Sequence, residues 1–265
     1  MCENRGGPTP AISADAPQSR QLQSLGAIVV HCQEQDKQSE RKRTTMVAAI
    51  LFDLDGTLVN TDPIHFKHWK VLLRDYGYEI DREFYDAKIS GGTNEAILAD
   101  ILPQLSPEQA RDFAEYKEAQ FRASGSDLQR LPGLTEMLAW VHYNNLKSAV
   151  VTNAPRANAE FMLATLDLAD TFSILVLAED APAGKPDPAP YLIAMDKLGV
   201  TAEMTIAFED SPSGIRAAVA AGIYTVGVAS THDPSRLHSA GASRTIRDFT
   251  DKELWEWLRV LDCVS

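Results

Sequence analysis

Two aspartates stand two positions apart directly after an apolar run. The run covers residues 47–52, and Asp53, Asp55 and Gly56 follow it. In an extended strand, residues two apart point the same way, and Gly56 permits a sharp turn after them. A carboxylate such as Asp53 can accept a phosphoryl group as a nucleophile, while a second carboxyl such as Asp55 donates and then accepts a proton. A pair of this kind can therefore carry out covalent phosphoryl transfer.

Other polar side chains that can handle phosphate follow later apolar runs. Thr152 and Asn153 end one run, Glu209 and Asp210 end another, and Lys185 lies in a loop between the two. Carboxylates crowded into one site repel each other, and such hard oxygen ligands suit Mg²⁺. Lys185 can hold a transferring phosphoryl group, and Thr152 can donate a hydrogen bond to its oxygens. The set predicts a magnesium-dependent site.

The elements that must position these residues alternate between strands and helices. Apolar runs predict strands buried on both faces at residues 47–52, 148–151, 174–177, 205–208 and 224–228. Residues 244–248 are a sixth strand candidate. Helix-like stretches lie between these strands at residues 134–143, 157–166, 191–198 and 215–221. This alternation predicts an α/β fold, a doubly wound parallel sheet with helices on both faces. Because the carboxyl ends of parallel strands meet at one edge, the polar residues should converge there.

Residues 61–129 interrupt this alternation. They contain only helix-like stretches, around residues 64–73, 96–102 and 108–121, with prolines between the last two. We therefore expect an α/β core from residues 46–60 and 130–265 and an inserted all-helical cap from residues 61–129. Ligands of such sheets bind outside the carboxyl ends of the strands, so a cap placed there could close over a substrate.

Composition narrows the classes of function. A formal net charge of −12 argues against a nucleic-acid surface, which requires basic patches. No apolar run reaches the ~18 residues of a membrane span. The three cysteines lack metal-binding spacing, which indicates free thiols in a reducing compartment such as the cytoplasm. We expect residues 1–45, which are polar and contain prolines, to be a disordered extension, with an organelle transit peptide as the alternative.

The four polar segments, each behind a predicted strand, resemble the motifs of the haloacid dehalogenase-like superfamily from about Met46 to the C-terminus. The resemblance implies a Rossmann-like core, Mg²⁺ as cofactor and a small phosphorylated metabolite as substrate. The implied catalytic residues are Asp53 as nucleophile, Asp55 as general acid and base, and Thr152 and Lys185 as phosphate-binding groups. The implied metal ligands are Asp53, the backbone carbonyl of Asp55, Asp210 and, in a supporting role, Glu209.

The position of the cap resembles the helical-cap subgroup. Residues 51–65, 151–160 and 208–214 resemble plant-type broad-range sugar-phosphate phosphatases in particular. This resemblance implies hydrolysis of sugar phosphates through an aspartyl phosphate on Asp53. We expect a monomer or weak homo-oligomer that binds neither nucleic acid nor membrane. The expected substrate-binding residues are His65, Gly91, Gly92, Thr93, Asn94 and Asn153.

Two alternatives stay open. A phosphosugar mutase of the β-phosphoglucomutase type also carries a histidine where His65 stands and an acidic pair like Glu209 and Asp210. The mutase, however, needs an arginine in the cap to hold a second phosphate, and Asn94 occupies that place here, which favours hydrolysis. The other alternative is a regulatory protein that binds phosphate without turnover. The intact set of Asp53, Asp55, Lys185 and Asp210 argues against it.

Overall fold

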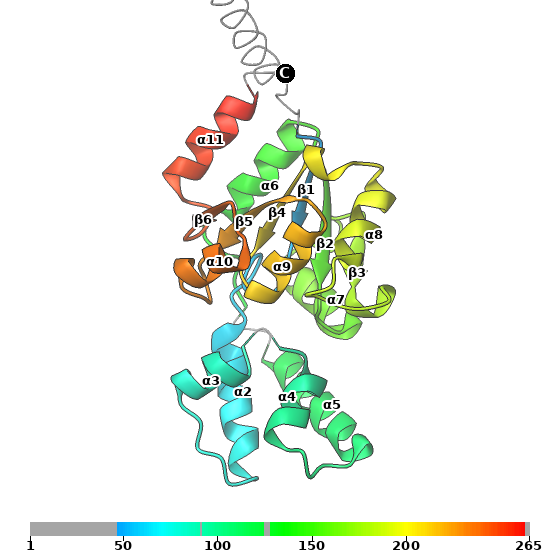
Figure 1. Ribbon diagram of the computed structural model, residues 1–265, viewed down its shortest axis with the longest axis vertical. Helices are drawn as coiled ribbons and strands as arrows, with labels where there is room; N and C mark the ends of the chain where they lie inside the picture. Colours follow the sequence, from blue (N-terminus) through cyan, green and yellow to red (C-terminus); the bar gives the residue numbers. More distant parts are fainter. Residues whose placement is uncertain (1–46, 91, 125–127, 263–265) are drawn as a thin grey trace, which may run out of the picture. The chain divides into compact units, whose positions relative to one another are not determined.

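Six parallel strands in the described part of the chain, residues 47–90, 92–124 and 128–262, form one sheet in the order β3-β2-β1-β4-β5-β6. They are β1 (Ala49–Phe52), β2 (Lys147–Thr152), β3 (Leu175–Leu177), β4 (Thr205–Glu209), β5 (Tyr224–Val228) and β6 (Arg244–Ile246). Every pairing in this computed structural model is parallel (Figure 1). The doubly wound parallel sheet is thus confirmed, while the predicted extension at residues 1–45 lies outside the described residues.

The central strand β1 is apolar along its length because helices cover both faces of the sheet. In β1, Ile50 and Phe52 belong to one apolar cluster, whereas Ala49 and Leu51 belong to the other. Three helices of the α/β core contribute to the first cluster, which also includes Ile64 and Phe121, and two helices contribute to the second. The first three are α6 (Leu134–Tyr143), α7 (Arg156–Thr165) and α11 (Lys252–Asp262), and the other two are α8 (Ala189–Leu198) and α9 (Pro212–Ala220).

The chain between β1 and α6 forms helices with an apolar cluster of their own. In the described residues they are α2 (Asp62–Arg74), α3 (Arg82–Lys88), α4 (Asn94–Ile101) and α5 (Pro107–Ala123). Trp69, Leu73 and Ile97 are buried in that cluster. The prediction missed α3, because its seven residues are too few to show a helical period. The limits of the cap at residues 61 and 129 stay a prediction.

The C-terminal part of the described chain covers the face of the sheet that carries Ile50 and Phe52. Leu254 and Leu258 of α11 are fully buried, and the Trp255 indole donates a hydrogen bond to the Phe249 carbonyl at 2.7 Å. The short helix α10 (Pro234–Ala240), which was not predicted, packs its Leu237 against Ile215 of α9. Among the described residues, none of the helices is both long and apolar enough to span a bilayer.

Candidate active site

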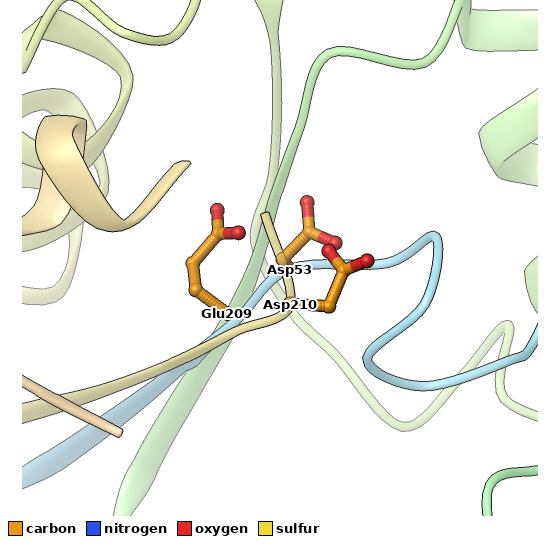
Figure 2. A group of neighbouring side chains, drawn as sticks. All are labelled: Asp53, Glu209 and Asp210. Atoms are coloured by element: carbon orange, nitrogen blue, oxygen red, sulfur yellow. The ribbon is translucent and has the colours of Figure 1, made fainter. Parts of the chain in front are cut away.

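The polar residues predicted at strand ends come together at one edge of the sheet. Asp53 follows β1, Thr152 ends β2, and Glu209 ends β4 directly before Asp210. Because β1 pairs with both β2 and β4, these residues are neighbours in space. Figure 2 shows three carboxylates extending from the ends of the two neighbouring strands β1 and β4.

A cavity of about 380 Å³ opens at this edge. Its lining includes Asp53, Asp55, Thr152, Lys185 and Asp210. Part of the wall comes from the inserted helices α2 to α5, so the cavity is bounded both by these helices and by the α/β core. A volume of this size suits a small metabolite.

Lys185 is the central positive charge of the site. Its Nζ donates to Asp53 Oδ1 at 2.6 Å, to Glu209 Oε1 at 2.5 Å and to the Val151 carbonyl at 2.7 Å. It also lies 5.2 Å from the centre of the Tyr191 ring. Burial alone would lower the pKa of Lys185, but Asp53 and Glu209 raise it above the usual value, so this lysine stays charged.

The carboxylates of Asp53, Glu209 and Asp210 form a group that fits a divalent cation. One oxygen from each lies within 4.8 Å of the others, and all three residues are buried. Asp210 also accepts a hydrogen bond from the Thr231 hydroxyl, and Glu209 accepts one from Tyr191 at 2.7 Å. Three buried carboxylates with one lysine leave excess negative charge, which a hard cation such as Mg²⁺ would neutralise.

The same crowding changes the acidity of these carboxyls in the metal-free protein. Burial is the main cause that raises the pKa of Asp53 to about 8, and the nearby Glu209 adds to the effect while Lys185 opposes it. Burial and the charges of Asp53 and Glu209 also raise the pKa of Asp210 well above its usual value. Without a cation, the site therefore holds protons that a bound cation would displace.

This acidity predicts how stabilisation by Mg²⁺ depends on pH. Unfolded Asp53 ionises near its ordinary value of 3.8 and folded Asp53 near 8, so between them the folded state holds the extra proton. Its contribution to the free energy of unfolding therefore falls as pH rises. Since Mg²⁺ binds the ionised carboxylates, the rise in Tm on replacing EDTA with Mg²⁺ should grow between about pH 5 and pH 8. A rise that stays constant or shrinks over this interval would contradict the assignment.

Asp55 faces a different set of partners. Its Oδ1 accepts a hydrogen bond from the Thr61 hydroxyl at 2.8 Å and lies 3.5 Å from His65 Nε2. Burial raises the pKa of Asp55, but His65 and Thr61 outweigh it and lower the pKa below its usual value. The sequence analysis assumed that the strand continues through Asp53 and Asp55, but β1 ends at Phe52. Both aspartates nevertheless line the cavity.

Thr152 and Asn153 lie at the carboxyl end of β2, at the position predicted from the sequence. The Thr152 hydroxyl accepts a hydrogen bond from the Ala154 backbone N–H at 3.0 Å, so its own proton is free to be donated. The Asn153 side chain accepts from the Lys185 N–H at 3.0 Å and donates to the Lys185 carbonyl at 3.1 Å. Asn153 therefore holds the loop that carries Lys185 as well as lining the cavity.

The remaining predicted substrate-binding residues come from the inserted helices. His65, Gly92, Thr93 and Asn94 line the cavity, while Gly91 lies outside the described residues. The His65 ring stacks on Phe121 with 4.5 Å between ring centres. Asn94 donates to Glu118 Oε1 at 2.5 Å. The structure thus brings these residues to the site, and their role toward a substrate stays a prediction.

Several residues at the site were not predicted from the sequence. Thr231 follows β5, so the strand-end rule that identified Thr152 would also have identified it. Lys117 and Glu118 line the cavity from within α5, and Asn158 lines it from the first turn of α7. Their sequence positions carry no signal of this kind, because only the packing of α4, α5 and α7 brings them together.

Known proteins are similar in sequence to this chain over most of its length. The family model described as haloacid dehalogenase-like hydrolase matches residues 50–228. A phosphorylated carbohydrates phosphatase of Thermotoga maritima is 31% identical over 203 residues, which cover 75% of this chain and 94% of the relative. A β-phosphoglucomutase of Bacillus subtilis is 28% identical over 232 residues, covering 82% and 99%.

A solved structure also shares the fold. A mutant of CbbY from Rhodobacter sphaeroides in complex with xylulose-(1,5)bisphosphate superposes with a TM-score of 0.68 at 26% identity. The match covers 78% of this chain and 96% of that protein. Proteins similar to this chain therefore include a phosphatase, a mutase and a protein whose structure was solved with a bisphosphate bound.

Proposed function

We propose that this chain, which belongs to the haloacid dehalogenase-like hydrolase family, is a Mg²⁺-dependent phosphatase of small phosphate monoesters, with sugar phosphates as the substrate class. One observation carries the proposal. Asp53 lies 2.6 Å from a buried lysine and within 4.8 Å of two further carboxylates, while Asp55 lines the same cavity with separate partners. The residues that we propose as nucleophile, phosphate-binding cation, metal ligands and proton carrier thus lie around one cavity.

In the first step, an Asp53 carboxylate oxygen attacks phosphorus and the bond to the leaving oxygen breaks. Lys185 and the Thr152 hydroxyl hold the phosphoryl oxygens, and Asp55 gives the leaving oxygen its proton, which releases an alcohol and forms an aspartyl phosphate. The lowered pKa of Asp55 means that it is ionised before substrate binds. The negative charge of the bound ester must therefore raise this pKa for the proton to be available.

In the second step, Asp55 acts as a base. It takes a proton from water, the water oxygen attacks phosphorus, and the bond to Asp53 breaks to give inorganic phosphate and the free carboxylate. The Thr61 hydroxyl and His65 hold Asp55 in place through both steps. Mg²⁺, held by Asp53, Asp210, the Asp55 carbonyl and with support from Glu209, would supply positive charge that keeps Asp53 ionised and stabilises the transferring phosphoryl group.

Substitution of Asp55 by asparagine should lower kcat by about 10²- to 10⁴-fold, because proton transfer is lost in both steps. A leaving group that needs no proton, such as p-nitrophenolate, should restore the first step alone. The expected result with p-nitrophenyl phosphate is a rapid burst of nitrophenol that matches the enzyme concentration, followed by slow turnover. A proportional loss for nitrophenyl and alkyl phosphates, with no burst, would count against this role.

Phosphate release from a panel of sugar phosphates, measured with Mg²⁺ and with EDTA, tests the proposed function. Metal-dependent release from several hexose and pentose phosphates is expected. The panel should include β-glucose 1-phosphate with a bisphosphate primer. Formation of glucose 6-phosphate without phosphate release would instead identify the mutase. Phosphate binding without either product would identify the regulatory alternative.

A further inference from the structure

A buried ion pair in the inserted helices lines the same cavity as Asp53. Lys117 and Glu118 of α5 are only 4% and 7% exposed, and Lys117 Nζ lies 2.7 Å from Glu118 Oε1. Removing two charges from water is costly, and the attraction between them only partly offsets that cost. Stability alone is therefore a weak reason for a buried pair at this position.

Glu118 accepts hydrogen bonds on both carboxylate oxygens. Besides Lys117, Asn94 donates to Oε1 at 2.5 Å and Asn158 donates to Oε2 at 2.5 Å. Arg122 in turn donates to Asn158 Oδ1 at 2.6 Å, which fixes the orientation of that amide. Burial raises the pKa of Glu118, but Lys117 and Asn94 outweigh it and lower the pKa below the usual value. The carboxylate is thus charged and firmly held.

The charges around the cavity disfavour a second anionic group. Of the cavity-lining residues described in the inserted helices, Lys117 is the only lysine or arginine, and Glu118 neutralises it. At the edge of the sheet, Asp53 and Asp210 are accompanied by Lys185. One phosphate can be held there with the help of a divalent cation, whereas a second phosphate would meet the Glu118 carboxylate without an unpaired cation nearby.

We propose that Glu118 determines specificity at this site: by cancelling the charge of Lys117, it selects phosphate monoesters with an uncharged, hydroxyl-rich remainder and rejects sugar bisphosphates. This inference rests on the proposed phosphatase function and deepens it. The held carboxylate and the amides of Asn94 and Asn158 offer acceptors and donors for hydroxyl groups. Rejection of bisphosphates also favours hydrolysis over the mutase reaction, which passes through a bisphosphate.

The test compares KM for fructose 1-phosphate and fructose 1,6-bisphosphate with Mg²⁺ present. In the wild-type protein, KM should be at least about tenfold higher for the bisphosphate, the order expected for one uncompensated like charge in a partly dry site. Glu118→Gln keeps the shape but frees the charge of Lys117, so it should lower this ratio about tenfold. The matched control is Glu115→Gln on the same helix, an exposed carboxylate outside the cavity lining, which should leave the ratio unchanged.

Several outcomes would overturn the inference. One is a wild-type ratio of bisphosphate KM to monophosphate KM near one. Another is the same ratio in Glu118→Gln as in the wild type. The third is a change of this ratio in Glu115→Gln as large as in Glu118→Gln. If Glu118→Gln does not fold, Lys117→Met takes its place and should raise the ratio, because the Glu118 charge is then unopposed. The wild-type ratio is decisive if neither variant folds. Failure of the proposed function is a separate result, since no sugar phosphate would then be hydrolysed by the wild-type protein at all.

Discussion

Substitution of Asp53 by asparagine should reduce Mg²⁺-dependent phosphate release by about 10⁴-fold or more while leaving the protein folded. An amide is a far poorer nucleophile than a carboxylate, so the aspartyl phosphate cannot form at a useful rate. The backbone N–H of Asp53 donates to the Phe208 carbonyl at 3.0 Å, and this link between β1 and β4 does not depend on the side chain. The measurement is kcat/KM for the best sugar phosphate of the panel, with Tm as the check of folding.

The matched control is Asp196→Asn on α8. Asp196 is exposed and lies outside the cavity lining, so the same chemical change there should leave kcat/KM unaltered. Turnover by the Asp53 variant within about tenfold of the wild-type rate would rule out a nucleophilic role. It would leave Asp53 as one metal ligand among others.

Substitution of Lys185 by methionine should have a large effect on both stability and activity. The change leaves Asp53 and Glu209 buried without their cation, and removing one partner of such a pair typically costs about 3 to 5 kcal/mol in the free energy of unfolding. The loss should be smaller with Mg²⁺ than with EDTA, because a divalent cation restores positive charge beside the carboxylates. Phosphate release should fall by about 10²- to 10³-fold, since the lysine also holds the phosphoryl oxygens.

Denaturant unfolding with EDTA and with Mg²⁺ measures the first effect, and steady-state kinetics measure the second. Lys197→Met on α8 is the control, because Lys197 is exposed and should change neither quantity by much. An equal destabilisation with and without Mg²⁺ would show that the cation does not bind beside Asp53 and Glu209. An unchanged rate of phosphate release would show that Lys185 does not hold the phosphoryl oxygens.

The core of the fold could be predicted because its strands are buried on both faces. In β1, every residue is fully buried, so the sequence shows a continuous apolar run that few other structures produce. The helices α3 and α10 escaped prediction because each has seven residues, and an apolar period needs a longer stretch to be visible. Their starts depend on single capping residues, Asp81 and Asp233, which also occur in ordinary turns.

The candidate site also has a part that could be predicted from the sequence and a part that could not. Asp53, Thr152 and Asp210 could be placed together because parallel strands present their carboxyl ends at one edge, whatever the detailed packing. The distant partners of Glu118 could not, because Asn94 and Asn158 come from two other helices whose contacts with α5 are set by tertiary packing. The sequence pointed to Asn94 as the residue in place of a cap arginine, but not to the carboxylate that Asn94 binds.

Chemical trapping of the phosphorylated enzyme tests the central claim most directly. The enzyme is mixed with substrate and Mg²⁺, quenched, and reduced with borohydride, which converts an aspartyl phosphate into homoserine. Peptide mass spectrometry then locates the modified residue, with the Asp55→Asn variant used to enrich the intermediate and Asp53→Asn as the negative control. The account predicts homoserine at position 53 only when substrate is present. Homoserine at another aspartate, or none during active turnover, would contradict it.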